Sequence, residues 1–154
     1  MTTYYADSSV LVRRHALEIG TSWFEAITQP TANNRIVTSR ISTIEVLSAF
    51  QLKQREGLLS AVHVNHLTTD FLALCSRDYS LVDVTVDVLD HARNLIQRYP
   101  LKAYDAVQLA SAGAVSTLLH TAGFEPLVFL SADRQLLRAA GATGLIVDSP
   151  DLHP

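Results

Sequence analysis

Four acidic residues stand where folding could bring them together: Asp7, Glu45, Asp105 and Asp133. Asp7 directly follows a short segment rich in Thr and Tyr, and Asp133 comes three residues after an apolar run that ends at Leu130. Carboxylates crowded into one crevice repel each other, which raises their pKa values, and a divalent cation removes that conflict. Because the ligands are hard oxygens without a His or Cys cluster nearby, the pattern favours Mg²⁺ or Mn²⁺ over zinc.

Asp105 opens a long helix that we expect to begin at Leu101 and end near Gly123. Its neighbours at i+4 and i+7, Leu109 and Ala112, are apolar, so the acid shares a face with core residues. A carboxylate removed from water is costly unless it meets a cation or hydrogen-bond donors. The alternative is an acid that is simply favoured by the N-terminal end of the helix dipole.

The other three acids also have ordinary structural explanations. Glu45 could be the second half of a capping box that begins at Ser42. Asp7 could cap the helix that it precedes, and Asp133 could begin a helix beside an N-capping Ser131. Each explanation is reasonable for one acid, but together they are less convincing. Helix capping does not require the first and last apolar strands to end in acids.

Strands alternate with helices along the whole chain. The strands that we expect are Thr3–Ala6, Arg35–Thr38, Ser80–Val84, Leu127–Leu130 and Leu145–Val147. This alternation predicts a single α/β domain, residues 1–154, with a mostly parallel sheet and right-handed crossovers. Ligands of such folds bind beyond the carboxyl ends of the strands, which is where the four acids would meet.

The composition describes a folded protein without a strong bulk attraction for nucleic acid. Of the 154 residues, 48% are hydrophobic and 18% charged, which suits a real core. The net charge is −3, so RNA binding would need local cations. The candidates beside the acidic motifs are Arg13, Arg14, Arg40 and Arg134.

The remaining features concern compartment and surface. The single cysteine, Cys75, excludes an internal disulfide, lies in an apolar run and fits a reducing cytosol. No apolar run approaches the ~20 residues of a membrane span, and the N-terminus lacks signal-peptide features. We expect the six scattered histidines at the surface: His15, His63, His66, His91, His120 and His153. Two neighbouring helices carry surplus apolar groups that predict an interface: Leu47, Phe50, Leu67, Phe71, Leu72 and Leu74.

Four short motifs resemble, in order, the acidic motifs of PIN domains, and most closely those of VapC-type toxins from bacterial toxin–antitoxin pairs. They are Tyr5-Ala6-Asp7-Ser8-Ser9, Ser42-Thr43-Ile44-Glu45, Tyr104-Asp105-Ala106-Val107-Gln108-Leu109-Ala110 and Leu130-Ser131-Ala132-Asp133. The resemblance covers essentially the whole chain. It implies a three-layer α/β/α sandwich, a metal-dependent ribonuclease, a homodimer in the cytoplasm and an antitoxin partner.

The resemblance also assigns roles. Asp7 and Asp105 would be the principal metal ligands, and Asp133 a ligand directly or through water. Glu45 would be a ligand or would orient the attacking water, although here it coincides with the capping position, whereas the family's acid often lies further into the helix. Two serines would support the acids by hydrogen bonds: Ser8 and Ser131.

Two other classes of function compete with a nuclease. One is a catalytically inactive PIN-like module that binds RNA or protein, against which the four retained acids count. The other is a different α/β phosphate chemistry. A haloacid-dehalogenase-type phosphatase needs an acid where Ser9 stands, and a receiver domain needs a late lysine, whereas no lysine follows Lys102.

Overall fold

The computed structural model describes all 154 residues and contains one sheet of five parallel strands. The strands lie in the order β3-β2-β1-β4-β5, so β1 is central. The chain moves outward from β1 to β3 and then returns to the other side of β1, which puts the topological switch point between β1 and β4. The bounds are β1 Thr3–Ala6, β2 Arg35–Ser39, β3 Tyr79–Val82, β4 Val128–Leu130 and β5 Ile146–Asp148.

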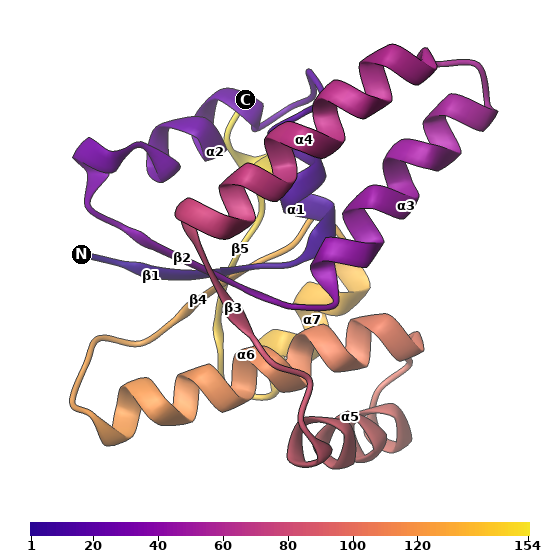
Figure 1. Cartoon of the computed structure of the whole chain (residues 1–154). Helices are drawn as coiled ribbons and strands as arrows, with labels where there is room; N and C mark the ends of the chain where they lie inside the picture. Colours follow the sequence, from indigo (N-terminus) through magenta and orange to yellow (C-terminus); the bar gives the residue numbers. More distant parts are fainter.

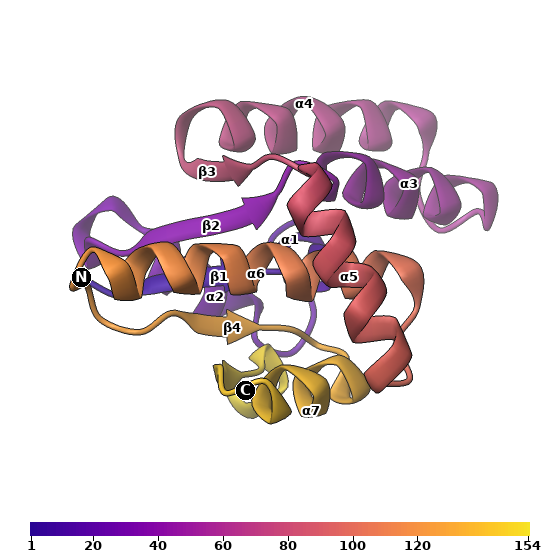
Figure 2. The same cartoon turned by 90° about the horizontal axis from the view of Figure 1, so that it is seen from below.

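Seven helices cover the two faces of the sheet (Figure 1). They are α1 Ser8–Arg13, α2 Thr21–Thr28, α3 Ser42–Arg55, α4 Ala61–Arg77, α5 Val86–Arg98, α6 Ala103–Thr121 and α7 Arg134–Ala142. Helices α1–α4 lie on one face and α5–α7 on the other, as the turned view in Figure 2 also shows. The predicted three-layer α/β/α sandwich is confirmed, with a fully parallel sheet.

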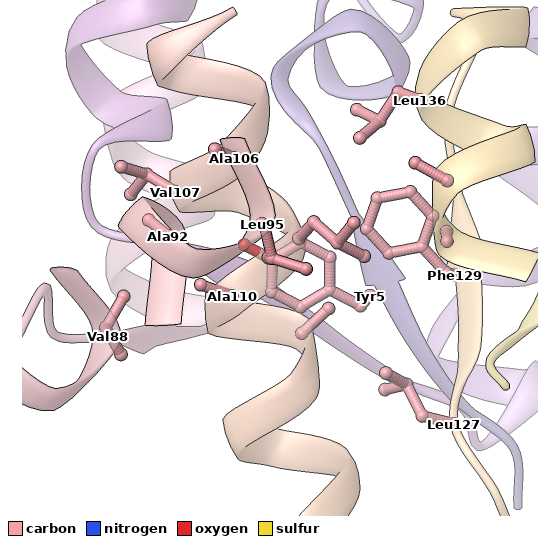
Figure 3. Close-up of a cluster of buried hydrophobic side chains, with 14 of the residues drawn as sticks. Tyr5, Val88, Ala92, Leu95, Ala106, Val107, Ala110, Leu127, Phe129 and Leu136 are labelled. Atoms are coloured by element: carbon pink, nitrogen blue, oxygen red, sulfur yellow. The ribbon is translucent and has the colours of Figure 1, made fainter. Parts of the chain in front are cut away.

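Each face of the sheet has its own core because side chains alternate along a strand. Tyr5 belongs to the core under α5–α7, where its ring stacks on Phe129 at 5.6 Å between centroids (Figure 3). The neighbouring Ala6 faces the core under α1–α4. Small residues on α6, Ala106 and Ala110 among them, let this helix lie close to the sheet, where it packs against β2.

The expected surplus of apolar surface on α3 and α4 is wrong for three of its six residues. Phe50 and Phe71 are fully buried and Leu74 nearly so, because the two helices pack on each other and α3 also packs on α1. The ring of His15 fills the space between the two phenylalanines in edge-on contacts. His15 is therefore not the surface residue that we expected, and burial lowers its pKa. Leu72 remains 44% exposed.

Several element boundaries lie one or two residues from the predicted ones. The third strand begins at Tyr79 and ends at Val82, two residues before the predicted end. The first helix begins at Ser8 and is capped by the Asp7 side chain, as the capping explanation for Asp7 predicts. Cys75 is buried, which agrees with its position in an apolar run. None of the seven helices has the length and hydropathy that a bilayer crossing requires.

Candidate functional site

Asp7 lies at the switch point of the sheet, directly after the central strand β1. Its backbone N–H donates to the carbonyl of Leu130 at 3.1 Å, which joins the ends of β1 and β4. The side chain accepts hydrogen bonds from the hydroxyls of Ser9 (2.5 Å) and Ser131 (2.6 Å) and from the backbone N–H of Val10 (3.2 Å). The predicted capping role and the predicted site position therefore belong to the same side chain.

Burial raises the pKa of Asp7 to about 6. The hydrogen bonds from Ser131, Ser9 and Val10 oppose this rise, whereas the nearby charge of Asp105 adds to it. Burial outweighs the donors because the carboxyl is only 3% exposed. A nearly dry carboxylate that keeps part of its proton at neutral pH gains most from a cation.

Glu45 lies in the first turn of α3, but it does not complete a capping box. The N-cap of α3 is Ile41, which makes no side-chain cap, and Ser42 has already entered the helix. The carboxylate of Glu45 instead accepts from the Ser8 hydroxyl at 3.0 Å and from Nε2 of Gln108 at 2.7 Å. The capping explanation for Glu45 is thus wrong, and Ser8 supports this acid as predicted.

Gln108 is a site residue that the sequence reasoning missed. Its side chain is 1% exposed, and its Oε1 accepts from the Tyr5 phenol at 2.7 Å. Its Nε2 donates to the Ser42 hydroxyl at 2.8 Å as well as to Glu45, and Ser42 is bonded in turn to Thr38. Burial raises the pKa of Tyr5, so the phenol stays protonated and fixes the orientation of the amide.

Asp105 is half-buried in the first turn of α6 and accepts no hydrogen bond. Burial raises its pKa, and the charges of Asp133 and Glu45 raise it further, whereas Lys102 lowers it. These interactions show that acids from α6, α7 and α3 are electrostatic neighbours. A carboxylate removed from water without a donor is costly, so this one in particular requires a positive partner.

Asp133 is exposed and is itself the N-cap of α7. Its Oδ1 accepts from the backbone N–H groups of Gln135 at 2.8 Å and Leu136 at 3.1 Å. The prediction that Ser131 caps this helix is wrong, because the Ser131 hydroxyl donates to Asp7 and accepts from the N–H of Asp133. No hydrogen bond uses Oδ2 of Asp133, so that oxygen is free for a ligand.

Ser9 is the second residue that the sequence reasoning missed. Its hydroxyl donates to Asp7 and accepts from the backbone N–H of Ala132 at 3.0 Å. Ser9 and Ser131 thus tie the loop after β1 to the loop after β4. A hydroxyl following an acid at a strand end is the sequence signal that marked Ser8, and it applied equally to Ser9.

The donor set fits a hard divalent cation in kind. The four acids supply only carboxylate oxygens, the ligands that Mg²⁺ and Mn²⁺ prefer. As the side chains stand, no three of them converge on one point. Asp7 and Glu45 accept hydrogen bonds from protein donors, whereas Asp105 and one oxygen of Asp133 accept none.

Most of the arginines considered for RNA are otherwise engaged. Arg13 is paired with Asp151 at 2.6 Å, and Arg40 with Asp83 at 2.6 Å. Arg14 donates to the Thr28 hydroxyl. Arg134, which follows Asp133, is exposed and unpaired.

The comparisons with known proteins agree on one family. The PIN domain model matches residues 4–142. Ribonuclease VapC45 of Mycobacterium tuberculosis (strain CDC 1551 / Oshkosh) is 31% identical over 161 residues, with 100% of both chains covered.

Solved structures with this fold include two from bacteria. VapBC2 of Rickettsia felis, bound to a DNA fragment from its promoter, has a TM-score of 0.66 at 12% identity, covering 96% of this chain and 98% of that one. The Sarcin-Ricin loop cleaving toxin VapC20 of Mycobacterium tuberculosis has a TM-score of 0.60 at 15% identity, covering 98% and 99%. At these identities the two structures support the fold alone.

Proposed function

Since this chain belongs to the PIN-domain family, we propose that it is a Mg²⁺- or Mn²⁺-dependent endoribonuclease and the toxin of a bacterial toxin–antitoxin pair. The observation that carries the nuclease proposal is Asp105. It is half-buried, without a hydrogen-bond donor, and beside two further acids that raise its pKa. A purely structural acid would have a donor or a cationic partner.

The acids divide the work in this proposal. Asp7 and Asp105 are the principal ligands of the ion, Asp133 contributes its free oxygen directly or through water, and Glu45 is a ligand or orients the attacking water. When bound, the ion supplies charge for the scissile phosphate and lowers the pKa of water. Ser9 and Ser131 keep Asp7 in place, and Ser8 and Gln108 do the same for Glu45: the distances are 2.5, 2.6, 3.0 and 2.7 Å.

The decisive variant is Asp105→Asn, which preserves size and removes the charge. We expect RNA cleavage to fall about 100-fold or more, because loss of a metal ligand removes several kcal/mol of transition-state stabilisation. Mn²⁺ affinity measured by calorimetry should fall as well. The metal-free fold should be at least as stable as the wild type, since repulsion from Asp133 and Glu45 is relieved.

Asp87→Asn is the matched control for Asp105→Asn. Asp87 is also an acid in the first turn of a helix, α5, but it is exposed. It does not belong to the acid cluster, the name used here for Asp7, Glu45, Asp105 and Asp133. This variant loses the same favourable interaction with a helix dipole and should retain cleavage and Mn²⁺ binding. Wild-type cleavage and wild-type Mn²⁺ affinity in Asp105→Asn would contradict the nuclease proposal and favour an inactive binding module.

The proposed partner is a cognate antitoxin, bound by a homodimer of this single domain. An apolar groove of about 330 Å³ lies between α1, the loop after it and the α3–α4 hairpin, and it suits an amphipathic helix. A cationic side chain from such a partner could pair with the acids and displace the ion. In this proposal the protein acts in the cytoplasm, which holds the RNA that it would cut.

Light scattering on the purified chain, alone and with the product of the neighbouring upstream gene, tests the assembly. We expect a dimer that binds the product, loses ribonuclease activity and partly regains it with excess Mg²⁺ or Mn²⁺. A monomer that does not bind the product at micromolar concentration would contradict the toxin assignment. It would still be compatible with a nuclease that acts without an antitoxin.

A further inference from the structure

Unpaired cations gather on one flank of the acid cluster. The arginines that form ion pairs with carboxylates are Arg13, Arg40, Arg77 and Arg93. The flank formed by the α5–α6 junction and the start of α7, called here the α7 flank, carries four exposed cations without such a pair: Arg98, Lys102, Arg134 and Arg138. The four cations of the α7 flank are therefore not held in ion pairs.

The α7 flank begins beside two of the acids. Lys102 is the N-cap residue of α6 and stands three residues before Asp105, which lies in the first turn of the same helix. Arg134 follows Asp133 directly, and Arg138 lies one turn further on the same side of α7. The opposite flank, at the start of α3, differs because its Arg40 is paired with a carboxylate.

The two segments of the α7 flank face each other across a hollow of about 150 Å³. Its lining consists of Tyr99, Pro100, Gln135, Arg138 and Ala139 and contains no acid. Figure 2 shows the end of α5 beside α7 at this place. The guanidinium carbon of Arg98 lies 5.6 Å from the centre of the Tyr99 ring. An aromatic wall beside cations is the combination with which proteins bind single-stranded nucleic acids.

We propose that the α7 flank binds a nucleotide of single-stranded RNA next to the scissile phosphate. Arg134 and Arg138 bind the phosphate, since guanidinium groups match phosphate geometry. The wall of Tyr99 and Pro100 receives the base. This inference rests on the proposed nuclease function. It adds that the RNA strand leaves the acids over α7 and not over α3.

The test uses the double variant Arg134→Gln/Arg138→Gln and a short fluorescein-labelled single-stranded RNA. Anisotropy is measured in EDTA, so that binding reports the cations of the protein alone. We expect the Kd to rise about tenfold or more, and the slope of log K against log salt to become shallower by about 0.7 for each lost phosphate contact. In Mg²⁺, KM should rise while kcat and the calorimetric Mn²⁺ affinity stay at the wild-type values.

Arg35→Gln/Arg55→Gln is the matched control, because it removes the same charge from two exposed, unpaired arginines elsewhere. Arg35 begins β2 at the amino ends of the parallel strands, opposite to the end where Asp7 lies, and Arg55 ends α3. Tyr99→Leu adds a second readout. It retains an apolar side chain in a partly buried position, and it should weaken RNA binding without changing the salt slope.

An equal loss of binding in both double variants would overturn the proposal, since net charge alone would then explain it. Wild-type RNA binding and KM in Arg134→Gln/Arg138→Gln would do the same. If that variant bound RNA as the wild type does but no longer bound the antitoxin, the flank would be a protein-binding surface instead. If the wild type cleaves no RNA but binds it through the α7 flank, the result supports the subsite and contradicts the nuclease function. If the wild type and Arg134→Gln/Arg138→Gln cleave RNA with the same KM and kcat, the result supports the nuclease function and contradicts the subsite.

Discussion

The two sides of the acid cluster are built differently. On one side, Asp7 and Glu45 have protein donors on both carboxylate oxygens, from three donors and two donors respectively. On the other side, Asp105 has no donor, and Asp133 uses one oxygen to cap α7. Protein donors thus hold the first pair, whereas Asp105 and the second oxygen of Asp133 have no hydrogen-bond partner. The four proposed ligands are therefore not equivalent in their hydrogen bonding.

Asp7 and Glu45 with their hydrogen bonds, called here the held side, explain how four carboxylates can lie near one another. Donors from Ser9, Ser131 and Ser8 spread the charge of the acids that lie deepest, so the cation has to compensate mainly for Asp105. Preorganised ligands on one side and adjustable ligands on the other would let an ion enter and leave without moving the sheet.

Asp7→Asn should have the largest effect, because it removes the buried ligand of the held side. Asn preserves the cap of α1 and can still bond to one of the two serines. We expect RNA cleavage to fall about 100-fold or more. Metal-free Asp7→Asn should be more stable than the wild type near neutral pH, by roughly 3 kcal/mol at most, since one pKa unit corresponds to about 1.4 kcal/mol.

The pH dependence of unfolding checks this prediction. Burial raises the pKa of Asp7 to about 6, so the folded protein holds this proton more tightly than the unfolded chain. The stabilisation is complete below the unfolded pKa, near 4, and is lost as the pH rises through 6. Metal-free wild type should therefore lose stability over this interval relative to Asp7→Asn. Parallel stability curves for the two proteins would show that Asp7 is not the buried acid described here.

The sequence predicts the frame of this site better than its interior. Alternating apolar strands and helices predict the sandwich, and the acids follow the ends of strands or open helices, so local pattern suffices to place them. The partners of the acids depend on contacts between distant segments, such as Gln108 with Glu45, which are 63 residues apart. The one signal for Gln108 is its large polar side chain in the otherwise apolar or small run from Ala106 to Ala112. The burial of Phe50 escapes local pattern for the same reason, since it depends on His15.

Gln108→Leu should have an intermediate effect by loosening the held side. Leu preserves volume on α6 but donates nothing to Glu45 or Ser42. Loss of a group that orients a metal ligand typically costs 10–100-fold, and we expect cleavage and Mn²⁺ affinity to fall by about that factor. The measurement is cleavage together with calorimetry. A variant that lost stability but retained both would make Gln108 a purely structural residue.

Tyr5→Phe is the companion of Gln108→Leu. The stacking on Phe129 is preserved, and only the phenol that fixes the amide is lost. The unbonded Oε1 of Gln108 should cost about 1–3 kcal/mol of stability. Cleavage should fall less than in Gln108→Leu, because the amide can still donate to Glu45. A larger fall in Tyr5→Phe would reverse the assigned order of the two residues.

Asp133 offers the smallest expected effect, because capping and metal binding use different oxygens of one side chain. Asp133→Asn preserves the cap, so stability should change by a few tenths of a kcal/mol. Asp133→Ala loses the cap as well and should cost about 1 kcal/mol. If the free oxygen serves the ion, both variants should lose the same factor in Mn²⁺ affinity, about tenfold, despite their different melting temperatures. Affinity that followed stability, intact in Asp133→Asn and reduced in Asp133→Ala, would make Asp133 a cap alone and leave the ion with three acids.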